Sequence, residues 1–345
     1  MDPLDFSIYR FLSPRGEARF WAGRRVIDPT TPAREIAARV GISENGVRVR
    51  LRNLSERGFL RGRTVTPNPS LFGVQVWVME LPVKGPGEVE RVYADLALVE
   101  GVVFARDTLD ERDRQIRVHF VSEEESTAHR RAALLQRLSP GGRSPDPRPY
   151  FIPPCDHQLT PLDWRLLQAL GLQPEASVAD LARAARISVK TASRRHRQLI
   201  DSRACWYTHG PDSEEFPLAL VQIVVGDPAE RERTAESVAR ETPNWMPVAR
   251  DGMGLEPGEA STVVAGLVPA DAPVALERLV SHFAGLAGVA SVRRTFALGS
   301  RTYPRWFTER VADHTRPERS ASAPPSNVPK LSGKSAVDTR HRRRS

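Results

Sequence analysis

The chain carries the same sequence pattern twice, at a spacing of 145 residues. The residues that keep this register, each with its counterpart, are Ile36 with Leu181, Ile42 with Ile187, Arg50 with Arg195, Leu54 with Leu199, Val76 with Val221, Leu134 with Leu279 and Phe151 with Phe296. A period this long exceeds the roughly 20–50 residues of solenoid repeats. The sequence therefore predicts a duplicated domain and not a repeat array.

Length and composition favour a globular chain of several domains. Its 345 residues are enough for two or three domains, and 40% hydrophobic with 27% charged residues is ordinary for a soluble protein. No apolar run approaches the ~20 residues that cross a bilayer. The N-terminus also lacks the basic start and long apolar core of a signal peptide. We therefore expect a cytoplasmic protein without a membrane partner.

Charge and motifs narrow the classes of function. The formal net charge of +8 favours a polyanionic partner, above all nucleic acid. The two cysteines, Cys155 and Cys205, have no metal-ligand spacing. Nucleophile elbows, phosphate-binding loops and zinc-protease motifs are absent from the sequence. The sequence thus predicts no catalytic residue, no metal site and no cofactor, and we expect that the chain is not an enzyme.

Each copy begins with three short predicted helices. Apolar residues at helical spacing, with capping residues before them, place these helices from Leu4, over Pro32–Arg39 and from Ser43 in the first copy. Their counterparts begin at Leu162, after Ser177 and at Ser188. The short connection between the second and third helices is typical of a helix-turn-helix. A hairpin expected over Phe59–Phe72 would complete a winged helix.

A βαββαβ order follows each helical unit, which is the ferredoxin-like arrangement. The expected elements of the first half are Val74–Val83, Glu88–Val99, Val102–Arg106, Gln115–Ser122, Thr127–Leu138 and Tyr150–Ile152. Those of the second half are Leu218–Val225, Ala229–Glu241, Val248–Asp251, Ser261–Val268, Pro273–Leu286 and Val289–Leu298. The predicted fold class is α+β, with two winged helix-turn-helix domains and two ferredoxin-like domains.

Composition shifts set the expected domain boundaries. Proline-rich segments separate the two halves, and the chain beyond residue 310 is rich in Pro, Ser and Arg with few large apolar residues. We expect winged helices over 1–73 and 154–215, ferredoxin-like domains over 74–153 and 216–310, and a disordered basic tail over 311–345.

The third helix of each copy has a basic outer face. Val47, Leu51 and Leu54 share one side of the first such helix, which leaves polar residues on the other. A helix of this kind fits the major groove of DNA, where Arg or Lys reaches guanine and Asn pairs with adenine. The candidate DNA-binding residues are Ser43, Asn45, Arg48, Arg50, Arg52, Lys190, Ser193, Arg194, Arg195 and Arg197.

Three residues of these helices have a second interpretation. Arg50 and Arg195 lie near the helix edge, a position that suits either a phosphate contact or an internal ion pair. His196 occupies the place of Leu51, and we expect it to be a core or edge residue.

These residues resemble the leucine-responsive (Lrp)/AsnC family of prokaryotic transcription regulators. The likeness is carried by Leu4, Asp5, Glu35, Ile36, Ala37, Gly41, Ile42, Ser43, Val47, Arg50, Leu54, Gly58, Leu71, Phe72 and Gly73. The second copy matches at Leu162, Asp163, Asp180, Leu181, Ala182, Ile187, Ser188, Arg195 and Leu199, and departs at Arg203, where the first copy has a glycine. The resemblance implies a winged helix that binds double-stranded DNA and a ferredoxin-like effector domain after it.

The resemblance also bears on assembly and on an effector. Effector domains of the family pair with one another, so two of them in one chain imply an internal pseudo-dimer, and a further homodimer stays open. We expect the two sheets to pack face to face through the faces that their helices leave uncovered. The glycine that the family places before an acidic residue in its amino-acid pocket is missing at Ala105–Asp107. A small-molecule effector is therefore left unidentified.

The main hypothesis is a sequence-specific DNA-binding transcription regulator with two recognition helices, spaced ~34 Å or a multiple apart. One alternative is a protein-interaction scaffold with degenerate winged helices. Another is an enzyme like the siroheme decarboxylases, which share this architecture. The candidate histidines for that chemistry, His119, His129, His157, His209 and His282, do not repeat at the 145-residue spacing.

Overall fold

The computed structural model describes residues 2–316, except 14–17, 22–23, 29–30, 58–62, 111–112, 140–143, 156, 210–217, 251–253, 256 and 270–272. Helices and sheets alternate through it, and the predicted α+β class is confirmed. None of the described helices is long and apolar enough to cross a membrane. The chain divides after Thr315, and the elements with defined structure belong to the unit Met1–Thr315.

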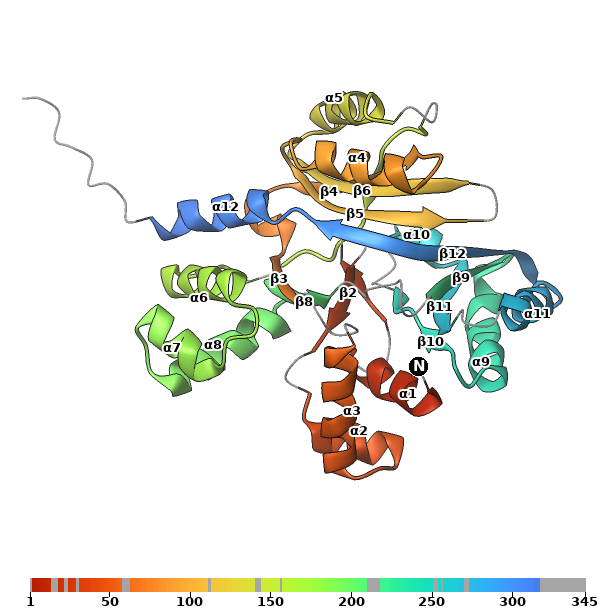
Figure 1. Ribbon diagram of the computed structural model, residues 1–345, viewed down its shortest axis with the longest axis horizontal. Helices are drawn as coiled ribbons and strands as arrows, with labels where there is room; N and C mark the ends of the chain where they lie inside the picture. Colours follow the sequence, from red (N-terminus) through yellow and green to blue (C-terminus); the bar gives the residue numbers. More distant parts are fainter. Residues whose placement is uncertain are drawn as a thin grey trace, which may run out of the picture. The chain divides into compact units, whose positions relative to one another are not determined.

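The first helix-turn-helix consists of α1 (Pro3–Phe11), α2 (Ala33–Val40) and α3 (Glu44–Glu56) (Figure 1). The Asp2 and Ser43 side chains cap α1 and α3 by accepting hydrogen bonds from the backbone N–H groups of Asp5 and Gly46. Gly41 ends α2 with a φ of 76°, a conformation that glycine adopts without steric cost. Local capping therefore explains where these helices begin and end.

The second helix-turn-helix consists of α6 (Pro161–Leu172), α7 (Val178–Ala185) and α8 (Val189–Asp201). Reciprocal capping boxes begin α6 and α7, formed by Thr160 with Asp163 and by Ser177 with Asp180. Arg186 ends α7 with a φ of 55°, at the position that corresponds to Gly41. The same left-handed turn is thus made by an arginine, for which this backbone conformation is sterically unfavourable.

The wing strands of both units belong to one four-stranded sheet. Its members are β1 (Phe20–Trp21), β2 (Arg24–Ile27), β3 (Thr64–Pro67) and β8 (Cys205–His209), in the order β1-β2-β8-β3. Strand β8 of the second unit lies between two strands of the first and is antiparallel to both. The two winged helices therefore share a sheet.

This arrangement corrects the expected hairpin over Phe59–Phe72. Thr64–Pro67 pairs with β8, about 140 residues away in sequence, and Pro69–Phe72 forms the short 3-10 helix η2. Residues 58–62 lie outside the described residues. The fully buried Asn68 fixes the turn, because its side-chain amide donates to the carbonyls of Pro153 and Arg203, both at 3.0 Å. Local turn signals cannot reveal partners so distant in sequence.

The first ferredoxin-like unit follows the predicted order. Its elements are β4 (Gln75–Pro82), α4 (Pro86–Leu96), β5 (Val102–Leu109), β6 (Arg114–Ser122), α5 (Glu125–Gln136) and β7 (Arg148–Tyr150). The strand order is β5-β6-β4-β7, and α4 and α5 pack on one face through a core that includes Trp77, Leu96 and Phe120.

The second ferredoxin-like unit has the equivalent order of strands, but its edge strand is only two residues long. Its elements are β9 (Leu218–Val225), the 3-10 helix η3 (Pro228–Glu230), α9 (Arg231–Glu241), β10 (Met246–Pro247), α10 (Pro257–Ala260), β11 (Val263–Pro269), α11 (Pro273–Ala284) and β12 (Val289–Thr302). The strand expected over Val248–Asp251 is instead β10, which ends at Pro247, and Asp251 lies outside the described residues. Gly266 faces Trp245 so closely that a Cβ would lie 2.2 Å from the indole.

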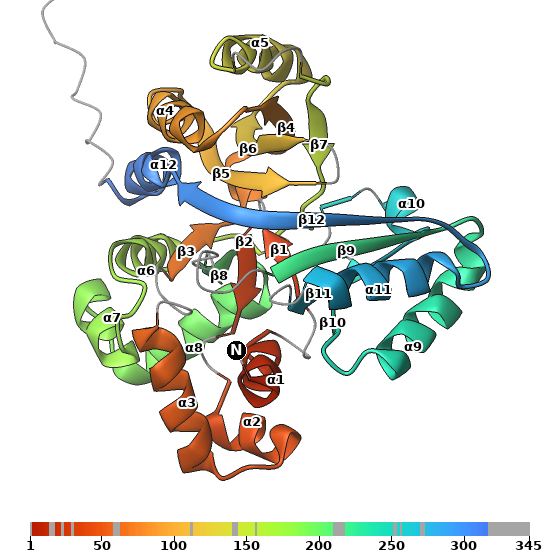
Figure 2. The same ribbon diagram turned by 45° about the vertical axis from the view of Figure 1, so that its right-hand side comes forward.

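The long strand β12 joins the two units (Figure 2). Residues 289–296 pair with β9, and residues 296–302 pair with β5, both antiparallel. One eight-stranded sheet results, in the order β10-β11-β9-β12-β5-β6-β4-β7. The expectation of two separate sheets packed only face to face is therefore wrong, because an edge strand of each unit supplies hydrogen bonds to the other.

Elements of the winged helices occupy much of the face that α4, α5, α9 and α11 leave free. The α1 residues Phe6 and Ile8 share a core cluster with Leu218 and Leu267 of the second unit. Trp21 and Val26 of the wing sheet pack with Val78 and Phe104 of the first. The faces that we expected to cover one another are thus covered largely by the helix-turn-helix units and their shared wing sheet.

Helix α12 (Arg305–Thr315) corrects the expected start of the tail at residue 311. Trp306, Phe307 and Val311 are buried, and the His314 ring stacks on Trp164 of α6 with centroids 4.1 Å apart. An apolar pair followed by a third apolar residue one turn later explains the packing of this helix. The remainder of the predicted tail, from residue 317, lies outside the described residues.

Candidate nucleic-acid interface

Helix α3 turns its apolar side inward and its predicted base-contacting residues outward. Val47 and Leu54 are buried, whereas Asn45, Arg48 and Arg52 are exposed. Arg48 forms an ion pair of 2.6 Å with Glu44 one turn earlier. Because that pair is exposed, it holds the side chain only weakly and leaves the guanidinium free to exchange partners. The hydroxyl of Ser43 caps the helix through the Gly46 N–H at 3.0 Å.

Arg50 is turned back toward α1. Its guanidinium lies 2.7 Å from the carboxylate of Asp2 and 2.6 Å from that of Asp5. Hydrogen bonds to these two carboxylates raise the pKa of Arg50. Burial opposes ionisation of Asp2, but the hydrogen bonds from Arg50 and from the backbone of Asp5 and Leu4, together with the charge of Arg50, outweigh it, and the pKa of Asp2 is lowered. Of the two interpretations of Arg50, the structure shows the internal ion pair.

Helix α8 presents a more basic outer face than α3. Lys190, Ser193, Arg194 and Arg197 are exposed and line a shallow groove along the helix surface. Among the described residues, no acid forms an ion pair with Lys190, Arg194 or Arg197. Three cations without an ion-pair partner among the described residues, in a groove that also holds Asp201, form a basic surface suited to phosphate or to guanine.

Arg195 repeats the geometry of Arg50. Its guanidinium lies 3.3 Å from the carboxylate of Asp163, which is 1% exposed. Asp163 also accepts hydrogen bonds from the backbone and hydroxyl of Thr160. One carboxylate thus joins the helix cap to the recognition helix, and Arg195 lies inward like Arg50.

His196 is a core residue, in agreement with its expected structural role. The ring is 7% exposed, and its Nε2 atom lies 2.7 Å from the hydroxyl of Tyr207 on β8. Burial lowers the pKa of His196. This hydrogen bond attaches α8 to the shared wing sheet.

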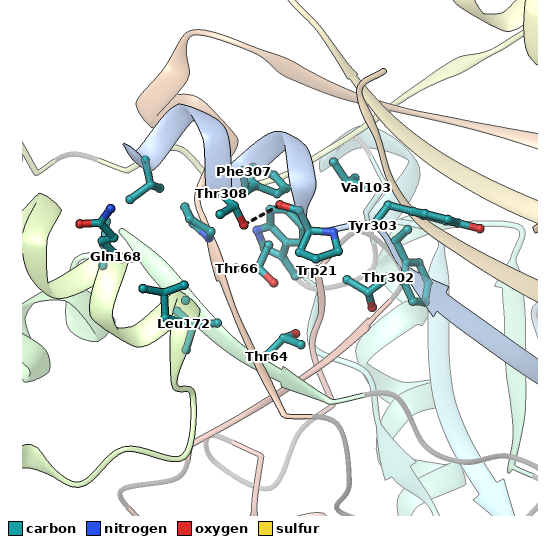
Figure 3. A pocket seen from close by; sticks show the side chains of 17 residues that line it. Trp21, Thr64, Thr66, Val103, Gln168, Leu172, Thr302, Tyr303, Phe307 and Thr308 are labelled. Atoms are coloured by element: carbon teal, nitrogen blue, oxygen red, sulfur yellow. Dashed lines mark hydrogen bonds between the residues drawn. The ribbon is translucent and has the colours of Figure 1, made fainter. Parts of the chain in front are cut away.

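Two cavities escaped the sequence analysis. The first, of about 180 Å³, is largely apolar and lies among α6, β3, β5 and α12; Figure 3 shows its lining, including Trp21, Tyr303 and Phe307. The second, of about 130 Å³, is lined by three arginines and His119. A signal for the second exists in β6, where Arg117 and His119 alternate with buried Ile116, Val118 and Phe120. Within the described residues, no cluster of His, Cys, Asp or Glu could hold a metal ion.

Comparison with known proteins places a DNA-binding segment at the first recognition helix. Residues 28–61 match a family model described as winged helix-turn-helix DNA-binding. This range contains α2 and α3, and therefore every candidate residue of the first copy. The match confirms the prediction of a winged helix-turn-helix in this part of the chain.

One curated relative has a similar segment. The HTH-type transcriptional regulator LrpA of Pyrococcus horikoshii is 46% identical over 46 residues, which are 13% of this chain. The chain thus spans about a third (33%) of the length of that relative. The likeness supports the resemblance to Lrp/AsnC regulators at the winged helix.

Solved structures with a similar order of elements include regulators and an enzyme. AsnC of E. coli aligns with 41% of this chain and 94% of its own, at 14% identity and a TM-score of 0.30. The siroheme decarboxylase NirDL, in complex with an iron-uroporphyrin III analogue, aligns with 90% of this chain and 99% of its own, at 13% identity and a TM-score of 0.46. The expectation that this chain is not an enzyme is therefore wrong as stated, because a structure that aligns with nearly all of it belongs to an enzyme.

Proposed function

We propose that this chain is a sequence-specific DNA-binding transcription regulator of the Lrp/AsnC type, acting in the cytoplasm. The observation that carries the proposal is the match of residues 28–61 to a DNA-binding winged helix whose outer face presents Asn45, Arg48 and Arg52. The basic face of α8 supports a second contact with the same duplex.

The proposed division of labour follows from where the arginines lie. Exposed Asn45, Arg52, Arg194 and Arg197 read base edges or phosphates, whereas Arg50 and Arg195 hold the helices in place through their ion pairs. Ser43, the N-cap of α3, and Ser193, on the exposed face of α8, contact backbone phosphates in this proposal. The shared wing sheet keeps the two reading helices at a fixed separation.

We further propose that the two halves descend from one duplicated regulator. The boundaries stay those expected from the sequence, 1–73, 74–153, 154–215 and 216–310, except that α12 extends the last unit to Thr315, and the two ferredoxin-like units serve as an internal pseudo-dimer. The equivalent strand orders β5-β6-β4-β7 and β10-β11-β9-β12 support this origin. So does the repeated pairing of an arginine on the third helix with an aspartate on the first.

The test is selection of bound fragments from random duplex DNA with the full chain, followed by titration of the selected sequence. We expect one enriched motif with two half-sites, and an affinity that falls steeply with salt because phosphate contacts release counterions. Arg52→Ala should relax the preference in one half-site by ~1–3 kcal/mol, and Arg194→Ala in the other.

A matched control is Arg91→Ala on α4, which removes an exposed arginine from the ferredoxin-like unit. It should leave both affinity and preference unchanged. Failure to enrich any motif, together with retention that does not depend on salt, would favour the protein-interaction scaffold and end the regulator proposal.

A further inference from the structure

The second cavity lies where the inner faces of the two ferredoxin-like units meet, and its two walls differ in chemistry. One wall comes from β5, β6 and β7 and carries Arg106, Arg117, His119 and Arg148. The opposite wall comes from β9, β11 and β12; it carries Leu218, Leu220 and Leu267 and, beside them, the uncharged polar Gln222 and Thr295. No Asp or Glu is among the described residues that line the cavity. The space is therefore basic on one side and uncharged, mostly apolar, on the other.

Arg106 enters this cavity without an acidic partner. The nearest charge partner of the neighbouring Arg117 is Glu80, at 3.0 Å, but the described residues offer Arg106 only the face of the Phe104 ring, 5.4 Å from its guanidinium carbon. Desolvation and the proximity of Arg117 lower the pKa of Arg106 to about 10. The group still carries its charge at neutral pH, in surroundings that do not neutralise it.

His119 is the second unsatisfied group. The side chain is 1% exposed, and neither ring nitrogen has a hydrogen-bond partner among the described residues. The ring packs edge-to-face against Tyr150, with centroids 4.9 Å apart, and lies 5.7 Å from the Phe104 ring. Burial, followed by the charges of Arg117, Arg106 and Arg148, lowers the pKa of His119 well below 6.5. A neutral imidazole therefore offers one donor and one acceptor toward the cavity.

The unpaired guanidinium of Arg106 and the unpartnered ring of His119 both destabilise the fold unless a bound molecule satisfies them. A buried polar group without a partner, such as the His119 ring, costs about 1–3 kcal/mol, and the unpaired charge of the partly buried Arg106 adds to that cost. Folded proteins seldom keep two such groups side by side, and when they do, the explanation is a ligand, a water or a strained site. An anion between Arg106 and His119 would accept a hydrogen bond from each and neutralise the guanidinium.

We propose that this cavity binds a small organic carboxylate, whose carboxylate group contacts Arg106 and His119 and whose apolar part rests on Leu218, Leu220 and Leu267. The planar guanidinium fork matches a carboxylate. An inorganic anion such as phosphate could bind the arginines, but on its other side it would lose water and gain no favourable contact with the leucines.

The size of the cavity limits the ligand. At about 130 Å³ it is much larger than the ~30 Å³ that a water molecule occupies in the liquid. It is close to the ~150 Å³ of an engineered apolar cavity that holds benzene. A carboxylate on a single six-membered ring is thus a suitable probe. The site is separate from α3 and α8, so binding can be measured without DNA and can fail independently of the proposed function.

The experiment is thermal denaturation and calorimetric titration of the full chain with benzoate, its neutral analogue benzamide, and inorganic phosphate. We expect benzoate to raise the melting temperature and to bind with a stoichiometry of one per chain, whereas benzamide and phosphate have at least tenfold lower affinity. The variant Arg106→Met should lose benzoate binding by more than tenfold. Its melting temperature without ligand should be equal to or higher than that of the wild type, because an unpaired charge has been replaced by a side chain of similar length.

The second variant and the control separate this site from nonspecific charge effects. His119→Phe keeps the ring packing and should also reduce benzoate binding. Arg130→Gln on α5 removes an exposed positive charge from the opposite face of the sheet and should bind benzoate like the wild type. Equal binding by wild type and Arg106→Met, equal binding of benzoate and benzamide, or no benzoate binding by the wild type would each overturn the proposal.

Discussion

The carboxylate of Asp163 at the start of α6 lies 3.3 Å from the guanidinium of Arg195 on α8. In the first half, Asp5 of α1 and Arg50 of α3 form the same pair at 2.6 Å. Each pair joins the first helix of a unit to its third. The sequence left Arg50 and Arg195 as either phosphate contacts or internal ion pairs, and the structure shows the ion pairs.

Breaking one of these pairs should weaken the fold more than it weakens DNA contacts. Arg195→Ala leaves the buried Asp163 with its capping hydrogen bonds and the His157 ring 3.8 Å away, so we expect a loss of about 1–2 kcal/mol in the free energy of unfolding. Urea denaturation measures it. Arg194→Ala, on the exposed face beside it, should change stability by less than about 0.5 kcal/mol. A larger loss for Arg194→Ala than for Arg195→Ala would contradict the assignment.

The left-handed turn after α7 is a place where stability can be gained. Arg186 has a φ of 55°, which costs a non-glycine residue about 1–2 kcal/mol. We expect Arg186→Gly to raise the free energy of unfolding by roughly 0.5–1 kcal/mol after the entropy of glycine is subtracted. Arg183→Gly, inside α7, should lower it by a similar amount. Melting temperatures of the two variants should therefore move in opposite directions.

Stability should fall when the solution is acidified below pH 6.5. The folded pKa of His119 lies well below 6.5, so the unfolded chain takes up a proton there that the folded chain does not bind. Stability is therefore fully present above pH 6.5 and is lost by about 1.4 kcal/mol per pH unit below it, until the folded pKa is reached. Urea unfolding at pH 7.5 and 5.5 measures the change.

The variant His119→Phe isolates this contribution from that of the carboxylates and of His196. It should lose less stability than the wild type over the same pH interval. An identical pH dependence in both proteins would show that His119 is not buried in its neutral form.

Helix α12 should be essential for the fold. Phe307 is buried and contacts the rings of Trp21 and Trp306, with centroids 5.6 and 5.0 Å away. We expect Phe307→Ala to cost about 3–5 kcal/mol in the free energy of unfolding. Glu309→Ala, on the exposed side of the same helix, serves as the control and should be nearly neutral. Similar denaturation midpoints for both variants would mean that α12 is not anchored by its aromatic residues.

Features that depend on neighbouring residues were predictable from the sequence. Both βαββαβ orders, the three-helix units and the structural role of His196 follow from apolar spacing and capping residues such as Thr160 and Ser177. Within α3, the buried positions Val47 and Leu54 fixed in advance which side faces outward. The type and order of the helices and strands therefore depend mainly on residues that are close together in the sequence.

Features that depend on distant pairing were not predictable. The partner of β3 is β8, and the partner of the end of β12 is β5, and no turn residue indicates either choice. The basic cavity escaped notice for the same reason, because Arg106 and His119 face Leu218 and Leu267 only once the two halves have joined. Helix α12 was missed because its few apolar residues gain their meaning from α6 and Phe72.

The position of β8 between β2 and β3 has a consequence for how this molecule can be divided. Cutting the chain in the middle would strip both neighbours from β8 and leave β2 and β3 each with an open edge. Bare strand edges seek new partners and promote aggregation. Neither half is an independent module. A fragment spanning residues 1–153 alone would expose the edges of β2 and β3 that pair with β8 in the intact chain.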